Sequence, residues 1–217
     1  MDNPFERFIQ NEHWKVPVMF GHTSSEFFSV PKAETLKELK KMAVDMFGDD
    51  AGAYMELCEA RCTDIEERKK RASVSSSEYA IRVATQANAD MVANTPMYYY
   101  VFDVEIPGWD NPGTFHSVDL WFFFETLAKC WRPFVGKHYD LARQMCNYWA
   151  YFIRSGDPNG HDSTGEELPR WEAYSLTAPY GMLFADRSEF SREEPSELMR
   201  FLVQQYFKKN WKRVHAE

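Results

Sequence analysis

Apolar residues recur at two different spacings along this chain, and each spacing predicts one type of element. Short unbroken apolar runs predict buried strands at residues 16–20 and 97–104, the second being rich in tyrosine, valine and phenylalanine between Pro96 and Pro107. A similar short run at residues 181–185 is a candidate for a last strand. The pattern therefore predicts a few sheet strands that are widely separated in the sequence.

Between and after these runs, apolar residues recur every three or four positions, which is the spacing of one helical face. Turn-forming residues such as Gly48, Gly156 and Pro158 mark the expected helix ends. The apolar run from Leu120 is too continuous for a surface helix. The expected helices cover residues 31–47, 51–62, 77–92, about 141–153, and a closing helix from residue 195.

Length and charge narrow the class of protein. A chain of 217 residues is long enough for one domain with a substantial core, since single domains reach roughly 200–250 residues. Its net charge of -8 disfavours nucleic acid and anionic membranes as partners, because both attract positive surfaces. No apolar stretch reaches the roughly 20 residues of a membrane span, and residues 1–6 lack the pattern of a signal peptide. We therefore expect a cytoplasmic protein, with its four cysteines as free buried thiols.

Two titratable residues follow the first two predicted strands. Glu26 comes shortly after the 16–20 run, which breaks at Gly21. His116 follows the 97–104 run, at the end of a loop that contains Pro112 and Gly113. A lone histidine after a strand is usually an ordinary polar loop residue, and Glu26 alone would be a surface carboxylate or helix-start residue. The two are credible as catalytic groups only as a pair.

The segments around these residues resemble the carboxylesterase type B and cholinesterase family of α/β-hydrolases, the para-nitrobenzyl esterases included. In that family a strand of the form v-P-v-m-x-G precedes the triad acid, and the triad histidine lies in G-x-x-H-x-x-[DE]. Residues 16–26 match the first motif, and Gly113, His116 and Asp119 match the second. Residues 98–103, 156–159 and 171–174 resemble further family landmarks, so the likeness covers nearly the whole chain.

The resemblance implies an α/β fold, with residues 1–217 forming a single partial α/β-hydrolase domain. It implies that Glu26 is the triad acid and His116 the general base. The strands that precede them should therefore be neighbours, and the carboxylate of Glu26 should lie within hydrogen-bond reach of a ring nitrogen of His116. Asp119 fits the acidic position of the motif, or simply caps the following helix. The helices between the first two strands either wall the substrate pocket or are ordinary packing helices. Candidate pocket residues are His22, Trp121, Phe122, Phe123 and Phe124, although His22 also suits a solvated loop and most of the aromatic residues suit a core.

One feature departs from the family. Acyl transfer requires a serine in a G-x-S-x-G turn, and neither that motif nor a Gly-Gly oxyanion stretch occurs in the sequence. Since α/β-hydrolases carry serine, acid and histidine in that order, the chain resembles the C-terminal part of a larger enzyme, with the nucleophile half absent. We therefore expect the chain alone to be inactive.

The partners follow from the same reasoning. A small ester would be the substrate of the complete enzyme, and the chain would self-associate or pair with the missing N-terminal half. No cofactor is implied, residues 157–162 lack the oxygen spacing of a calcium loop, and no cysteine and histidine spacing fits zinc. A non-catalytic, cholinesterase-like binding module and a truncated product without independent function stay open as alternatives.

Overall fold

The computed structural model describes residues 7–8, 10, 12, 14–59 and 61–214. The chain divides into two compact units. Unit 1 comprises residues 1–26 and 84–194, and unit 2 comprises residues 27–83 and 195–217. The two units are described separately below, and the expectation of a single domain stays a prediction.

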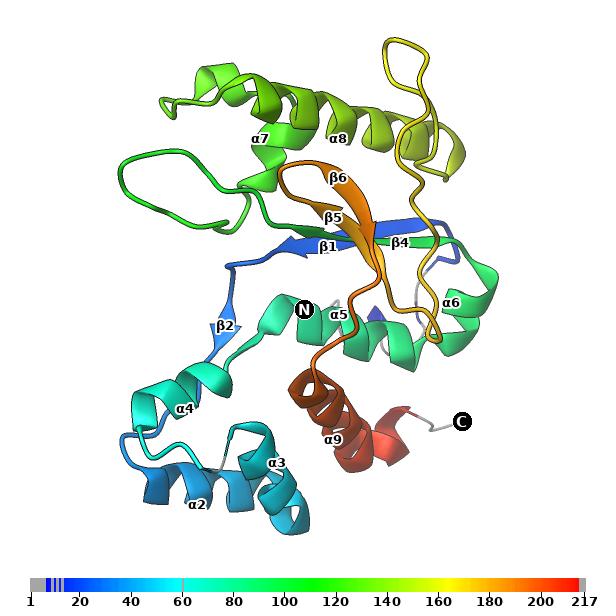
Figure 1. Ribbon diagram of the computed structural model, residues 1–217. Helices are drawn as coiled ribbons and strands as arrows, with labels where there is room; N and C mark the ends of the chain where they lie inside the picture. Colours follow the sequence, from blue (N-terminus) through cyan, green and yellow to red (C-terminus); the bar gives the residue numbers. More distant parts are fainter. Residues whose placement is uncertain (1–6, 9, 11, 13, 60, 215–217) are drawn as a thin grey trace. The chain divides into compact units, whose positions relative to one another are not determined.

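Unit 1 is built around a mixed four-stranded sheet with the order β1-β4-β5-β6 (Figure 1). Strands β1 (Val18–Thr23), β4 (Met97–Phe102) and β5 (Gly181–Phe184) run parallel, and β6 (Ser188–Ser191) pairs antiparallel with β5. The three strands predicted from the sequence are therefore confirmed, while β6 was not predicted. Because β1 and β4 are neighbours, their carboxyl ends and the loops that follow them meet at one edge of the sheet.

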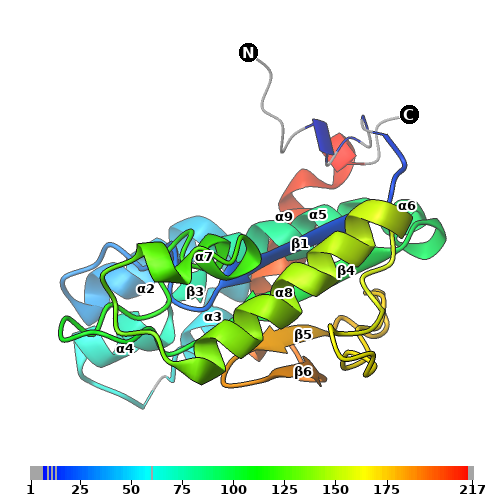
Figure 2. The same cartoon turned by 90° about the horizontal axis from the view of Figure 1, so that it is seen from above.

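Side chains of β4 alternate across the sheet, and one set faces the main core. Tyr98 and Tyr100 pack there against helix α8 (Gly136–Ser155), which runs along that face of the sheet (Figure 2), and Phe102 packs against Phe122. Trp171 is fully buried among these rings and donates its indole N–H to the carbonyl oxygen of Tyr99 at 3.1 Å. The core thus holds the strand that precedes the histidine loop. In unit 1 the structure also describes α6 (Ala89–Asn94), α7 (Asp119–Phe123) and the 3-10 turn η2 (Leu127–Lys129).

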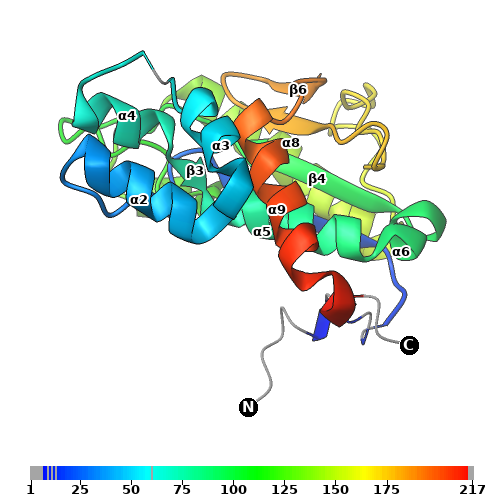
Figure 3. The same ribbon diagram turned by 90° about the horizontal axis from the view of Figure 1, so that it is seen from below.

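Unit 2 is mainly helical (Figure 3). Its core contains the stripe Leu39, Ala43 and Phe47 of α2, together with Tyr54 of α3 and Leu198 of α9. The spacing of four residues in α2 is the helical spacing that the sequence showed. The elements of unit 2 are β2 (Phe28–Ser29), α2 (Leu36–Phe47), η1 (Gly48–Asp50), α3 (Ala51–Leu57), α4 (Ile65–Arg71), β3 (Val74–Ser75) and α9 (Glu197–Val214), while α5 (Ser76–Ala87) continues into unit 1.

Helix boundaries differ from the expected ones for local reasons. Helix α2 begins at Leu36 rather than Pro31 because Thr35 caps it, accepting a hydrogen bond from the Glu38 N–H. Helix α3 ends at Leu57, and Glu59 has a φ of 54°. The helix expected at 77–92 is two helices, separated at Asn88. Among the described residues, none of the helices combines the length and the apolar character needed to cross a membrane.

Candidate active site

The loops after β1 and β4 bring the predicted acid and base together. Glu26 ends the loop after β1, and His116 ends the loop after β4. Gly21 allows the close approach of these strands, since a Cβ at this position would lie 2.4 Å from the ring and the carbonyl oxygen of Tyr100. Both residues belong to unit 1. The expectation that their strands are neighbours is confirmed.

The imidazole of His116 is hydrogen-bonded to the carboxylate of Glu26. The Nδ1 atom of His116 lies 2.6 Å from Oε2 of Glu26, so the predicted contact is confirmed. A carboxylate only accepts, and therefore Nδ1 carries the proton in this bond and Nε2 holds the lone pair of the neutral ring. The Glu26 side chain is 7% exposed and that of His116 is 61% exposed. The other Glu26 oxygen, Oε1, accepts from the Thr23 N–H at 3.2 Å, which orients the carboxylate.

A chain of hydroxyl groups joins the two loops beside this pair. The Oγ atom of Ser24 donates to Asp103 at the end of β4 and contacts Oγ1 of Thr114 in the histidine loop. Thr114 Oγ1 also lies 3.1 Å from Oγ of Ser25, and Thr114 is buried. These contacts fix the spacing between the acid loop and the histidine loop. Sequence reasoning missed them, since single serines and threonines in loops carry no pattern.

Both candidate catalytic residues are followed by a residue in the left-handed region. Phe27 has a φ of 47° and Ser117 a φ of 69°, and neither is a glycine. This conformation brings the Cβ close to the following carbonyl oxygen and costs roughly 1–2 kcal/mol for an ordinary residue. The surrounding structure therefore holds the two loops in a conformation that the local sequence disfavours.

Asp119 extends the site on the buried side. It is the first residue of α7 rather than its N-cap, and its Oδ2 accepts a hydrogen bond from the Tyr100 hydroxyl at 2.9 Å. Burial raises the pKa of Asp119 above its usual value, and the nearby charge of Glu26 adds to this effect. Burial likewise raises the pKa of Tyr100, with the charge of Asp119 as the next cause. The charge of Glu26 thus lies close enough to Asp119 to affect that carboxyl.

The candidate pocket residues lie in different environments. His22 is buried, and its ring bonds to the carbonyl oxygen of Thr23 at 3.0 Å and the hydroxyl of Tyr99 at 2.9 Å. Phe122 and Phe123 belong to the core of unit 1, Phe124 is 67% exposed, and Trp121 packs partly buried against that core. These residues therefore range from fully buried to largely exposed. Their role in a substrate pocket stays a prediction.

In the described part of the chain, the other candidates for chemistry are metal ligands, disulfides and a calcium loop. There, no cluster of three histidine, cysteine, aspartate or glutamate side chains could hold a metal ion. Cys58, Cys62, Cys130 and Cys146 are free thiols as expected, but only Cys58 among them is buried, so the expectation that all four are buried is wrong. Residues 157–159 form a turn in which Asp157 accepts from the Asn159 N–H at 2.9 Å. The Glu26 and His116 pair is therefore the arrangement with clear acid and base geometry.

Comparison with known proteins identifies relatives of the chain. The model of the carboxylesterase family matches residues 1–201. Carboxylesterase 5A from Canis lupus familiaris is 52% identical over 40 residues, which are 18% of this chain and 6% of that protein. Acetylcholinesterase from Gallus gallus is 31% identical over 94 residues, which are 41% of this chain and 11% of that protein.

The fold is similar to that of solved esterases. A thermophilic PNB esterase superposes with a TM-score of 0.60 at 17% sequence identity, over 93% of this chain and 41% of the esterase. This likeness assigns the mixed sheet and its helices to the α/β-hydrolase fold. The chain spans about two fifths of that esterase, and the matched segments of the curated relatives cover a still smaller share of their lengths.

Proposed function

This chain belongs to the carboxylesterase family, and we propose that it contributes the acid and the base of a serine esterase, Glu26 and His116. The 2.6 Å hydrogen bond between Nδ1 of His116 and Oε2 of Glu26 carries the proposal. Further support comes from the buried position of Glu26 and the exposed position of His116, which leaves the imidazole accessible to a reacting group. The substrate class is a small ester of a carboxylic acid.

The proposed chemistry is general acid and base catalysis around an acyl-enzyme. Nε2 of His116 takes the proton from a serine hydroxyl as the serine oxygen attacks the ester carbonyl, and then gives it to the departing alcohol. Water attacks the acyl-serine in the same way, releasing the acid and restoring the serine. Glu26 keeps the proton on Nδ1 and stabilises the imidazolium that forms. The attacking serine and the oxyanion donors lie on another segment, because the 217 residues contain no G-x-S-x-G.

A second candidate is a non-catalytic binding module of the same family. The missing G-x-S-x-G motif favours it, since a module that only binds needs no nucleophile. The Glu26 and His116 pair favours the esterase, since a binding module needs no aligned acid and base. The two candidates differ in whether His116 matters once a nucleophile is present.

The chain alone gives the first test. We expect it to hydrolyse p-nitrophenyl acetate no faster than its His116→Ala variant and to resist labelling by a serine-directed phosphonate. Stoichiometric labelling would reveal a nucleophile on this chain. The second test joins the chain to a contiguous upstream coding segment that carries G-x-S-x-G. His116→Ala should then lower kcat on the order of 10⁴-fold, and equal rates of the two proteins would favour the binding module.

We also propose that the chain pairs through the open edge of β1. Among the described strands, β1 has a neighbour on one side only, so its other edge presents unpaired N–H and C=O groups. Sedimentation at micromolar concentration should show a dimer or larger assembly, or a complex with the nucleophile half. A sharp monomer that binds no hydrophobic dye would contradict this proposal.

A further inference from the structure

Unit 2 contains an open groove with a volume of about 420 Å³. Every described residue that lines it belongs to unit 2, and neither Glu26 nor His116 is among them. Phe47 of α2, Val74 of β3 and Leu202 of α9 form its apolar part. The volume lies near the lower end of the roughly 300–1,000 Å³ typical of small-molecule sites, so the groove suits a small ligand with an apolar portion.

Two phenol groups lie among the lining residues. Tyr79 comes from α5 and Tyr206 from α9, and the two are close enough that Tyr206 contributes, after burial, to the raised pKa of Tyr79. A tyrosine hydroxyl can donate a hydrogen bond to an anionic oxygen. The groove therefore combines an apolar surface with a pair of adjacent donors.

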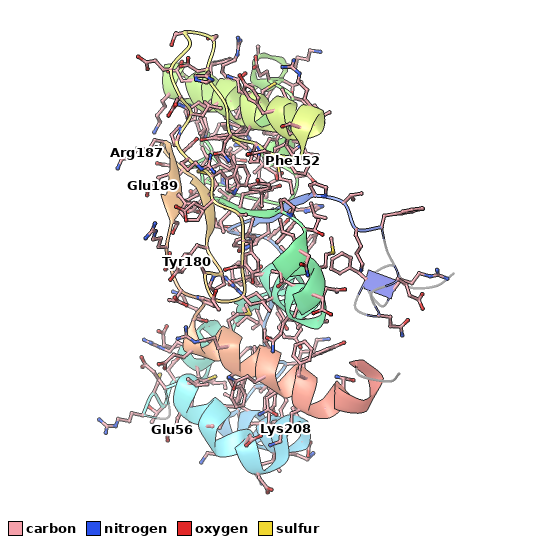
Figure 4. The ribbon with its side chains drawn as sticks, turned by 90° about the vertical axis from the view of Figure 1, so that its right-hand side faces the viewer. Glu56, Phe152, Tyr180, Arg187, Glu189 and Lys208 are labelled. Carbon is pink, nitrogen blue, oxygen red and sulfur yellow. The ribbon has the colours of Figure 1, made fainter. Side chains whose placement is uncertain are left out.

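Lys209 gives the groove a positive charge. It is exposed, its Nζ lies 5.7 Å from the centre of the Phe47 ring, and it alone carries a charge among the described lining residues. In the part of the chain that the structure describes, no carboxylate forms an ion pair with it. The neighbouring Lys208, which also lies on α9 (Figure 4), differs from Lys209. Its Nζ bonds to Asp50 Oδ2 at 2.5 Å, and it does not line the groove.

Asp50 does not neutralise Lys209. The same Oδ2 atom of Asp50 also accepts from Nε2 of Gln205 at 2.7 Å, and these two bonds lower the pKa of Asp50. The Asp50 carboxylate thus forms its ion pair with Lys208. A ligand whose apolar portion contacts Phe47, Val74 and Leu202 would place its polar group near the Lys209 ammonium. That polar group should therefore carry a negative charge.

We propose that this groove binds an amphipathic monocarboxylate, with the alkyl chain on the apolar side chains and the carboxylate at Lys209, assisted by the hydroxyls of Tyr79 and Tyr206. A neutral alcohol of the same length lacks the charge that Lys209 favours, and an alkylammonium is repelled by it. The site does not depend on the esterase proposal, because binding needs no catalytic residue.

Calorimetry on the full 217-residue chain tests the site with sodium octanoate, octan-1-ol and octylammonium chloride. We expect saturable binding of one octanoate, weaker binding of octanol and weakest binding of octylammonium. Lys209→Gln should weaken octanoate binding by about tenfold while leaving octanol unchanged, because it removes one charge-assisted contact. The matched control, Lys208→Gln, should leave octanoate binding within about twofold, since its partner Asp50 lies outside the lining residues.

The location of binding is read independently by methyl NMR of methionine-labelled protein. Met46 lines the groove, whereas Met145 and Met182 are buried in unit 1. Octanoate should shift the Met46 methyl resonance and leave the other two unchanged. Equal affinity for octanoate and octanol, equal loss in Lys208→Gln and Lys209→Gln, absence of saturable binding, or an unshifted Met46 would each overturn the proposal.

Discussion

Replacing Ser117 with glycine should stabilise unit 1, although glycine substitutions usually destabilise. Ser117 directly follows His116 and has a φ of 69°. A left-handed conformation costs roughly 1–2 kcal/mol for a residue with a Cβ, and glycine adopts it freely. Glycine also loses about 0.5–1 kcal/mol through the greater freedom of the unfolded chain. The difference predicts a net gain of about 0–1.5 kcal/mol in the unfolding free energy of Ser117→Gly, with a central value of about 0.75 kcal/mol.

Ser163→Gly is the matched control. Ser163 is an exposed turn residue of unit 1 and is not among the residues with positive φ, so only the entropic loss applies. It should lose about 0.5–1 kcal/mol, which separates the two variants by about 1–2 kcal/mol. Urea unfolding followed by tryptophan fluorescence measures this difference, and six of the seven tryptophans lie in unit 1. Equal destabilisation by both glycines would refute the claim that the histidine loop holds a strained residue.

Three further changes test the core and the site. Trp171→Phe should lower the unfolding free energy by about 2–3 kcal/mol, because it removes the indole hydrogen bond and leaves a cavity. Circular dichroism during urea unfolding measures this loss. A loss as small as that of Trp109→Phe, at an exposed tryptophan, would be inconsistent with a buried indole. Thr114→Val should cost about 1–2 kcal/mol in the same assay, since it removes the hydroxyl between the two loops. Burial raises the pKa of Asp119, so its ionised carboxylate destabilises the folded state and its protonated form does not. Asp119→Asn should therefore be more stable than the parent protein near pH 7 and lose this advantage near pH 3. A stability difference that stays constant with pH would exclude this reasoning.

The sequence predicted the strands with a run of apolar side chains and missed the three that contain a single apolar residue, namely β2, β3 and β6. The run Tyr98 to Phe102 is apolar throughout and was identified. Strand β6, Ser188–Ser191, contains a single apolar residue and forms only because β5 offers it an edge. Strand β1 continues past Phe20 to Thr23 because backbone pairing with β4 does not depend on side-chain polarity. The existence of β6 and the last residue of β1 depend on which strands pair, and the pattern of a single sequence does not show this.

The candidate site was predictable where it rests on a motif. Glu26 and His116 lie 90 residues apart, and their contact followed from the family resemblance and from the expectation that their strands are neighbours. The bridge from Ser24 to Thr114 depends on the exact loop conformation, which no spacing encodes. The groove around Lys209 draws its lining from elements distant in the sequence, so only the fold reveals it.

The tautomer of His116 tests the central claim most directly. A general base needs the proton on Nδ1, held by Glu26, and the lone pair on Nε2. Long-range ¹H–¹⁵N NMR of the purified chain near pH 8.5, about two units above the pKa of an ordinary histidine, distinguishes the two nitrogens. The account predicts a His116 ring protonated at Nδ1 in the parent protein, and loss of this preference in Glu26→Ala. A ring protonated at Nε2, or one that is indifferent to Glu26→Ala, would contradict it.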